Sequence, residues 1–123
     1  MTILESIHRV DSLKPNTYST KQKILWLSQL EATVKRLVLD AHEGNAEQEF
    51  SEFTENTDTA TVLFMPIPYD SAYLYWLEAQ IHYANEDIEL YNSAMQMFNA
   101  TFRAYKADYK RNHTTKTAGR FRF

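Results

Sequence analysis

The chain has 123 residues, a hydrophobic fraction of 44%, a charged fraction of 24% and a net charge of −3, which are ordinary values for a single globular domain spanning residues 1–123. It contains no cysteine and only two glycines, so disulfides, thiolate catalysis, cysteine-based zinc sites and glycine-rich phosphate loops are not expected. No stretch has the apolar length of a membrane span, and the charged N-terminus does not resemble a signal peptide.

The first predicted helix begins after Thr2. Thr2 and Glu5 have the spacing of a capping box, in which each side chain bonds the backbone of the other residue. Apolar residues recur at helical spacing from Ile3 to Leu13. Pro15 ends this helix, because the residue before a proline is pushed out of the helical region.

A second helix is predicted to start near Ser19, which forms another candidate capping box with Gln22. Gly44 is the expected C-terminal stop, because glycine adopts the left-handed cap at little cost. One apolar stripe indicates an amphipathic helix. The stripe consists of Leu27, Leu30, Val34, Leu37 and Val38.

The middle of the chain is expected to lack regular helix. Residues 45–59 are polar and acidic, with two isolated phenylalanines, and predict a loop. Residues 59–66, TATVLFMP, are β-branched and apolar but end in proline, which favours an extended segment or an edge strand. One strand makes no sheet alone, so this segment either packs across the helices or pairs with a partner chain.

A third helix is predicted from Asp70 or Ser71, either of which can cap it, to about Tyr83. After a short break, Asn85 is the expected cap of the last helix, which ends near Asn112. This last helix has the clearest pattern, a heptad seam typical of a helix lying against other helices. The seam consists of Ile88, Tyr91, Met95, Phe98, Phe102, Tyr105 and Tyr109.

These elements together predict an all-α fold. About four helices would pack as a small bundle, with one short extended segment before the third helix and an irregular basic C-terminal tail.

The stretch PIPYDSAYLYWLEAQ, residues 66–80, is unusually rich in Tyr and Trp. Stacking on nucleic acid requires nearby basic charge, whereas the charges here are Asp70 and Glu78. Burial in the core or in a subunit interface is the better interpretation. With the seam aromatics, the candidate packing or interface residues are Tyr69, Tyr73, Trp76, Tyr91, Phe98, Phe102 and Tyr105.

No catalytic constellation is evident. Glu78 and His82 have the i, i+4 spacing of two metal ligands, but no third ligand matches, so a surface ion pair is the plainer interpretation. No nucleophile motif of the G-x-S-x-G type occurs. We therefore expect neither an enzyme nor a protein with a metal or another cofactor.

Charge is distributed unevenly along the sequence. Residues 1–102 carry six Lys or Arg against fifteen Asp or Glu, whereas the C-terminal extension, residues 103–123, carries seven against one. The extension would contact phosphates or an acidic surface such as residues 40–58 of a neighbouring subunit, and a solvated tail is the plain alternative. Aromatic residues at its end favour docking. The candidate partner-binding residues are Lys110, Arg111, Lys116, Arg120, Phe121, Arg122 and Phe123.

Two long stretches, RVDSLKPNTYSTKQKILWLSQLE and MPIPYDSAYLYWLEAQIHYANEDIELYNSAMQMFNATFRAYKADYKR, carry a family resemblance. They are similar to small head–tail connector (adaptor) proteins of tailed bacteriophages and prophages of Gram-positive bacteria. The matching motifs are Pro15 to Tyr18, Lys23 to Leu27, Pro68 to Asp70, and the pairs Tyr91–Asn92 and Phe98–Asn99. The resemblance covers almost the whole chain outside the acidic loop and the last few residues.

This resemblance implies a non-enzymatic virion protein that binds beneath the portal ring. Its expected partners are the portal protein and other connector subunits, with a homo-oligomer in the assembled virion, DNA passing the ring and no membrane. The expected location is the virion, and the host cytoplasm during assembly. A nucleic-acid-binding module that uses the basic extension is the alternative, and the state of the isolated chain stays open.

Overall fold

In a computed structural model of the chain, which describes residues 1–40 and 50–113, the fold is all-α. This confirms the predicted small bundle. The described part contains four α-helices and a short π-helical turn, and no strand longer than an isolated bridge. Their bounds are α1 (Ile3–Leu13), α2 (Thr20–Val34), η1 (Lys35–Leu39), α3 (Ser71–Ala84) and α4 (Ile88–Asn112).

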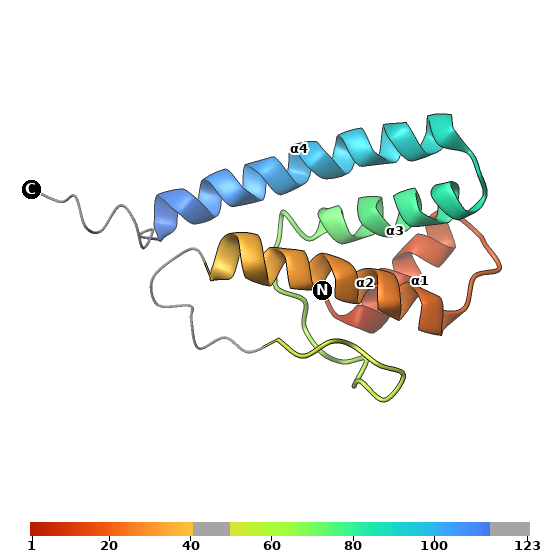
Figure 1. Cartoon of the computed structure of the whole chain (residues 1–123), viewed down its shortest axis with the longest axis horizontal. Coiled ribbons are helices and arrows are strands. Elements are labelled where there is room, and N and C mark those ends of the chain that lie inside the picture. Colours follow the sequence, from red (N-terminus) through yellow and green to blue (C-terminus); the bar gives the residue numbers. More distant parts are fainter. Residues whose placement is uncertain (41–49, 114–123) are drawn as a thin grey trace, which may run out of the picture.

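The helices α2, α3 and α4 run side by side, and α1 crosses them at an angle (Figure 1). α3 and α4 form an antiparallel pair, in which α4 is the longer helix with 25 residues against 14. The final turns of α4 therefore extend past the start of α3 (Figure 1). Residues 103–112 of the predicted basic extension belong to this helix.

The predicted capping box at the start of α1 is confirmed. The Thr2 hydroxyl accepts the Glu5 N–H at 3.1 Å, and the Glu5 carboxylate accepts the Thr2 N–H at 3.2 Å. The extended segment lies against this same end of the helix, because the Leu63 N–H donates to the Met1 carbonyl at 2.9 Å. Of the two expected alternatives, this segment packs across the helices of its own chain, with Leu63 buried.

α2 begins where expected, with the Ser19 hydroxyl accepting the Gln22 N–H at 3.1 Å. The prediction that Leu37 continues the buried stripe is wrong, since this side chain is 53% exposed. A π-helical turn has more residues per turn than an α-helix, so η1 turns Leu37 outward and places Leu39 in the core instead. The predicted stop at Gly44 lies outside the described residues.

Two predicted caps differ in the structure. Asp70 occupies the N-cap position of α3 but makes no capping hydrogen bond with its side chain. Asn85 ends α3 rather than starting α4, and Asp87 caps α4 by accepting the Leu90 N–H at 3.2 Å. Asn85 and Asp87 have different roles because Glu86, which lies between them, has a φ of 62° and reverses the chain before α4 begins.

No helix among residues 1–40 and 50–113 is long and apolar enough to cross a membrane.

Candidate interaction surface

Tyr73, one of the predicted packing residues, lies at the centre of the core and is fully buried. Its hydroxyl accepts the Met65 N–H at 2.8 Å and donates to a carboxylate oxygen of Glu31. The Tyr73 hydroxyl thus links α3 both to the extended segment and to α2. Burial, followed by the negative charge of Glu31, raises the pKa of Tyr73 well above its usual value.

Glu31 itself was missed in the sequence. It is 1% exposed, and its second carboxylate oxygen accepts the Phe64 N–H at 2.8 Å. Burial raises the pKa of Glu31 to about 7, against the smaller opposing effect of its two hydrogen bonds. One signal was available, because Glu31 lies four residues after Leu27 and three before Val34, within the apolar stripe of α2.

The remaining predicted aromatics join α3 to α4 within one chain. The Trp76 ring lies 5.3 Å from that of Phe98, and the Trp76 indole N–H donates to the Trp26 carbonyl at 2.8 Å. Further along the same interface, Tyr69 meets Tyr105 at 5.6 Å. Phe102 stacks on Phe98, and Tyr91 meets the half-exposed ring of Tyr83. The α3–α4 contact is therefore a continuous aromatic layer.

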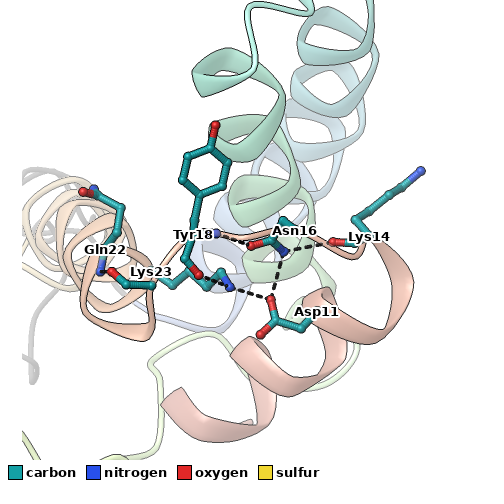
Figure 2. A network of polar contacts seen from close by, with 7 residues as sticks. Asp11, Lys14, Asn16, Tyr18, Gln22 and Lys23 are labelled. Atoms are coloured by element: carbon teal, nitrogen blue, oxygen red, sulfur yellow. Dashed lines mark hydrogen bonds and ion pairs between the residues drawn. The ribbon is translucent and has the colours of Figure 1, made fainter.

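Figure 2 shows a second polar network, at the joint between α1 and α2. The Lys23 ammonium is almost completely buried and bonds both the Asp11 carboxylate at 2.7 Å and the Tyr18 carbonyl at 2.9 Å. The Asn16 amide donates to Asp11 at 3.0 Å and to the Lys14 carbonyl at 2.9 Å. These contacts fix the angle between the two helices.

The same joint also contacts the turn between α3 and α4, which lies at the same end of the bundle (Figure 1). The Tyr18 hydroxyl donates to the Asn85 side chain at 2.6 Å, so the α1–α2 connection is fastened to the α3–α4 turn. Asn85 therefore has a bridging role that differs from its predicted capping role.

The Glu78–His82 pair is part of an ion-pair group. The Glu78 carboxylate lies 3.6 Å from the His82 ring nitrogen and 3.6 Å from the Lys14 ammonium. Within residues 1–40 and 50–113, no three His, Asp or Glu side chains come together in a way that would hold a metal ion. His82 is buried, at 8% exposed, so the predicted surface position is wrong for this residue, although its ring and the Glu78 carboxylate make the predicted i, i+4 contact.

The basic end of α4 is the part of the predicted partner-binding site that the structure describes. Lys110 and Arg111 are exposed in its last turn, and Arg111 forms an ion pair with Asp108 at 3.1 Å. The other predicted partner-binding residues lie outside the described part of the chain. They are Lys116, Arg120, Phe121, Arg122 and Phe123.

A hollow of about 380 Å³ lies beside this basic end, between α4 and the extended segment. The Tyr109 and His113 rings stack at 3.8 Å along one side of it. Its lining joins aromatic and aliphatic side chains with one carboxylate, Asp108. Together with the basic end of α4, the hollow forms a surface that combines positive charge with an apolar depression. Its lining residues are Leu39, Leu63, Phe64, Pro66, Tyr105, Asp108, Tyr109, Asn112 and His113.

Comparisons of the chain with protein-family models, with curated proteins and with solved structures find no match.

Proposed function

We propose that the chain is a non-enzymatic structural subunit of a tailed bacteriophage or prophage, a head–tail connector (adaptor) protein. The observation that carries this proposal is the pairing of opposite charge on opposite sides of one bundle. The exposed basic residues Lys110 and Arg111 end α4, whereas the exposed residues Glu52, Glu55 and Asp58 belong to segment 50–58. That segment lies beyond α2, on the side away from α4 (Figure 1).

This arrangement suits a ring. Subunits in a ring meet head to tail, so two different faces of each chain must complement each other. The basic end of α4 supplies one face, and the acidic segment 50–58 supplies the other. The hollow beside Tyr109 adds an apolar component next to the basic charge. The Phe-Arg-Phe sequence at residues 121–123 would seat in such a hollow on the portal or on a neighbouring subunit.

The test combines the purified protein with its portal and images the product by electron microscopy. We expect added ring density beneath the portal. The double variant Lys110→Glu/Arg111→Glu should weaken recruitment, because both side chains would repel the acidic surface they are proposed to meet. Arg9→Glu, a charge reversal of the same kind at an exposed position on α1, is the control. A portal that never recruits the wild-type protein would remove the connector assignment.

A nucleic-acid-binding module is the second candidate. The specific observation in its favour is a group of four exposed basic side chains on the second half of α4, namely Arg103, Lys106, Lys110 and Arg111. A gel shift with duplex DNA at two salt concentrations distinguishes the candidates. Tight binding that falls steeply with salt would favour this function, and an absent shift in low salt would exclude it.

A further inference from the structure

α4 carries a second heptad row, separate from its buried seam and facing away from the bundle. Its largest members are Leu90 and Met97, which are 46% and 50% exposed. Every member is exposed in the single chain, and the 3, 4, 3, 4 spacing is that of a helix–helix contact. The row consists of Leu90, Ser93, Met97, Ala100, Ala104 and Ala107.

The row is polarised in size. Its large side chains, Leu90 and Met97, lie in the first half of α4, and its alanines lie in the second half. The same helix is polarised in charge, since its N-cap Asp87 and Glu89 are at its start and Lys110 and Arg111 at its end. A helix with these two gradients complements a copy of itself only when the copy runs in the opposite direction.

We propose that two copies of this chain pair through the outer row of α4, with the two helices antiparallel. In the register that centres the row, Leu90 of one copy lies over Ala107 of the other. Met97 lies over Ala100, and Ser93 meets Ala104. Each large side chain thus faces a small one, which permits close approach of the helices.

The charges agree with this register. Along one edge of the row, Glu89, Gln96, Arg103 and Lys110 recur every seven residues and are all exposed. Edge residues of this type face each other in antiparallel pairs, so Glu89 meets Lys110 of the other copy and Gln96 meets Arg103. A parallel pair in register would instead place Leu90 against Leu90 and Ala104 against Ala104, so large side chains would meet large ones and small side chains small ones.

The opposite edge of the row consists of positions 87, 94, 101 and 108, which also recur every seven residues. On this edge Asp87 approaches Asp108, the one like-charge contact of this register. There the ion pair between Arg111 and Asp108, at 3.1 Å, supplies compensating charge.

This pairing goes beyond the proposed function and does not depend on it. It is a symmetric contact made by the protein alone, whereas the connector proposal concerns recruitment by a portal. The hollow beside Tyr109 is formed against the extended segment, on a different side of α4 from the outer row. Lys110 takes part in both proposed contacts, so Met97→Glu, which leaves the basic end of α4 unchanged, is the variant that separates loss of the dimer from loss of portal recruitment.

The first experiment measures mass by sedimentation velocity over a concentration series of the full chain. We expect a monomer–dimer equilibrium. Met97→Glu or Ala100→Glu should shift it to monomer, because each variant would bury a charge between the two outer rows. Asn99→Glu adds the same charge at an exposed position outside the row and should leave the equilibrium unchanged. Circular dichroism of each variant verifies that the helices are intact. A wild-type protein that stays monomeric throughout the series would overturn the proposal.

A charge exchange tests the register. Glu89→Lys alone and Lys110→Glu alone should each weaken the dimer by at least about tenfold, because each creates two repulsive edge contacts. The double variant Glu89→Lys/Lys110→Glu restores both opposite-charge contacts and should recover dimerisation. Recovery cannot arise from altered net charge, since the double variant has the wild-type charge. Double variants as weak as the single ones would contradict the register.

Cysteine cross-linking tests the orientation, and the natural chain has no cysteine to interfere. Leu90→Cys and Ala107→Cys chains are oxidised separately and as a mixture. An antiparallel pair predicts a mixed disulfide between the two variants and little cross-linking of either alone. Efficient cross-linking of the Leu90→Cys chain to itself would demonstrate a parallel pair and overturn the proposal.

Discussion

Glu31 is a buried carboxyl group on which three elements converge. It stands on α2, accepts the Phe64 N–H of the extended segment and accepts the Tyr73 hydroxyl of α3. The Tyr73 hydroxyl also accepts the Met65 N–H. Glu31 and Tyr73 therefore supply hydrogen-bond acceptors for the backbone N–H groups of Phe64 and Met65, which belong to no helix. The extended segment is therefore held in place by side chains instead of by a sheet.

Stability should depend on pH through this residue. The pKa of Glu31 is about 7 in the folded chain against an ordinary value of 4.5. Between these values the folded chain binds a proton that the unfolded chain has lost, so the free energy of unfolding falls as pH rises. The full shift corresponds to at most roughly 3 kcal/mol, reached above pH 7. Urea unfolding of the wild type at pH 4.5 to 8 measures this loss.

The matched variant is Glu31→Gln, which keeps the shape and removes the titration. Every other ionisable group is shared, so the difference between the two pH profiles isolates Glu31. We expect a shallower fall for the variant in this window. Parallel profiles would mean that the carboxyl is ionised in the folded chain.

The position of Glu31 in the stripe was visible in the sequence, but its partners were not. Tyr73 lies 42 residues away, and the Phe64 partner is a backbone N–H, which has no sequence signature. Lys23 presents the same difficulty. It lies four residues before Leu27 on the same face, and its acceptors Asp11 and the Tyr18 carbonyl come from α1 and a loop.

At the scale of elements, the α1–α2 joint depends on Lys23. We expect Lys23→Met to lower the free energy of unfolding by roughly 2 kcal/mol, because the Tyr18 carbonyl and the Asp11 carboxylate lose a buried charged donor. The control is Lys21→Met, which removes an exposed ion pair with Glu55 and should cost less than about 1 kcal/mol. Equal effects in urea unfolding would show that the joint does not need the buried charge.

The aromatic layer between α3 and α4 carries the second element-scale prediction. Phe98 is 7% exposed between Trp76 and Phe102, so Phe98→Ala should destabilise by roughly 3–5 kcal/mol. Ile88 was predicted to belong to the same seam, but this is wrong because its side chain is 56% exposed. Ile88→Ala should therefore change stability by less than about 1 kcal/mol. A small effect at Phe98 would mean that the seam contributes little within one chain.

Element boundaries were predictable where a cap is local. The Thr2–Glu5 box is complete within four residues, and the sequence pattern located it directly. The break before α4 depends on a positive φ at Glu86. A glutamate in a sequence does not indicate a positive φ, so the predicted capping role of Asn85 is wrong. The outward turn of Leu37 depends on a π-helical turn, for which periodicity offers no sign.

At the scale of the whole molecule, the charge asymmetry of the sequence becomes a spatial one. The sequence alone distinguished an acidic body from a basic end, but it could not place them on opposite sides of a bundle. In the structure, α4 lies on one side of α2 and α3, and the acidic segment 50–58 lies on the other side of α2 (Figure 1).

The last prediction separates folding from docking. The buried cluster of the described chain draws its residues from Ile3 to Tyr105, with Tyr109 packed against it. Deleting residues 114–123 should therefore change the free energy of unfolding by less than about 1 kcal/mol. If the Phe-Arg-Phe end docks on a portal, the same deletion should abolish recruitment, as measured by co-sedimentation with the portal. A truncated protein that unfolds readily would assign the end to the core, whereas undiminished recruitment would transfer docking to α4 and its hollow.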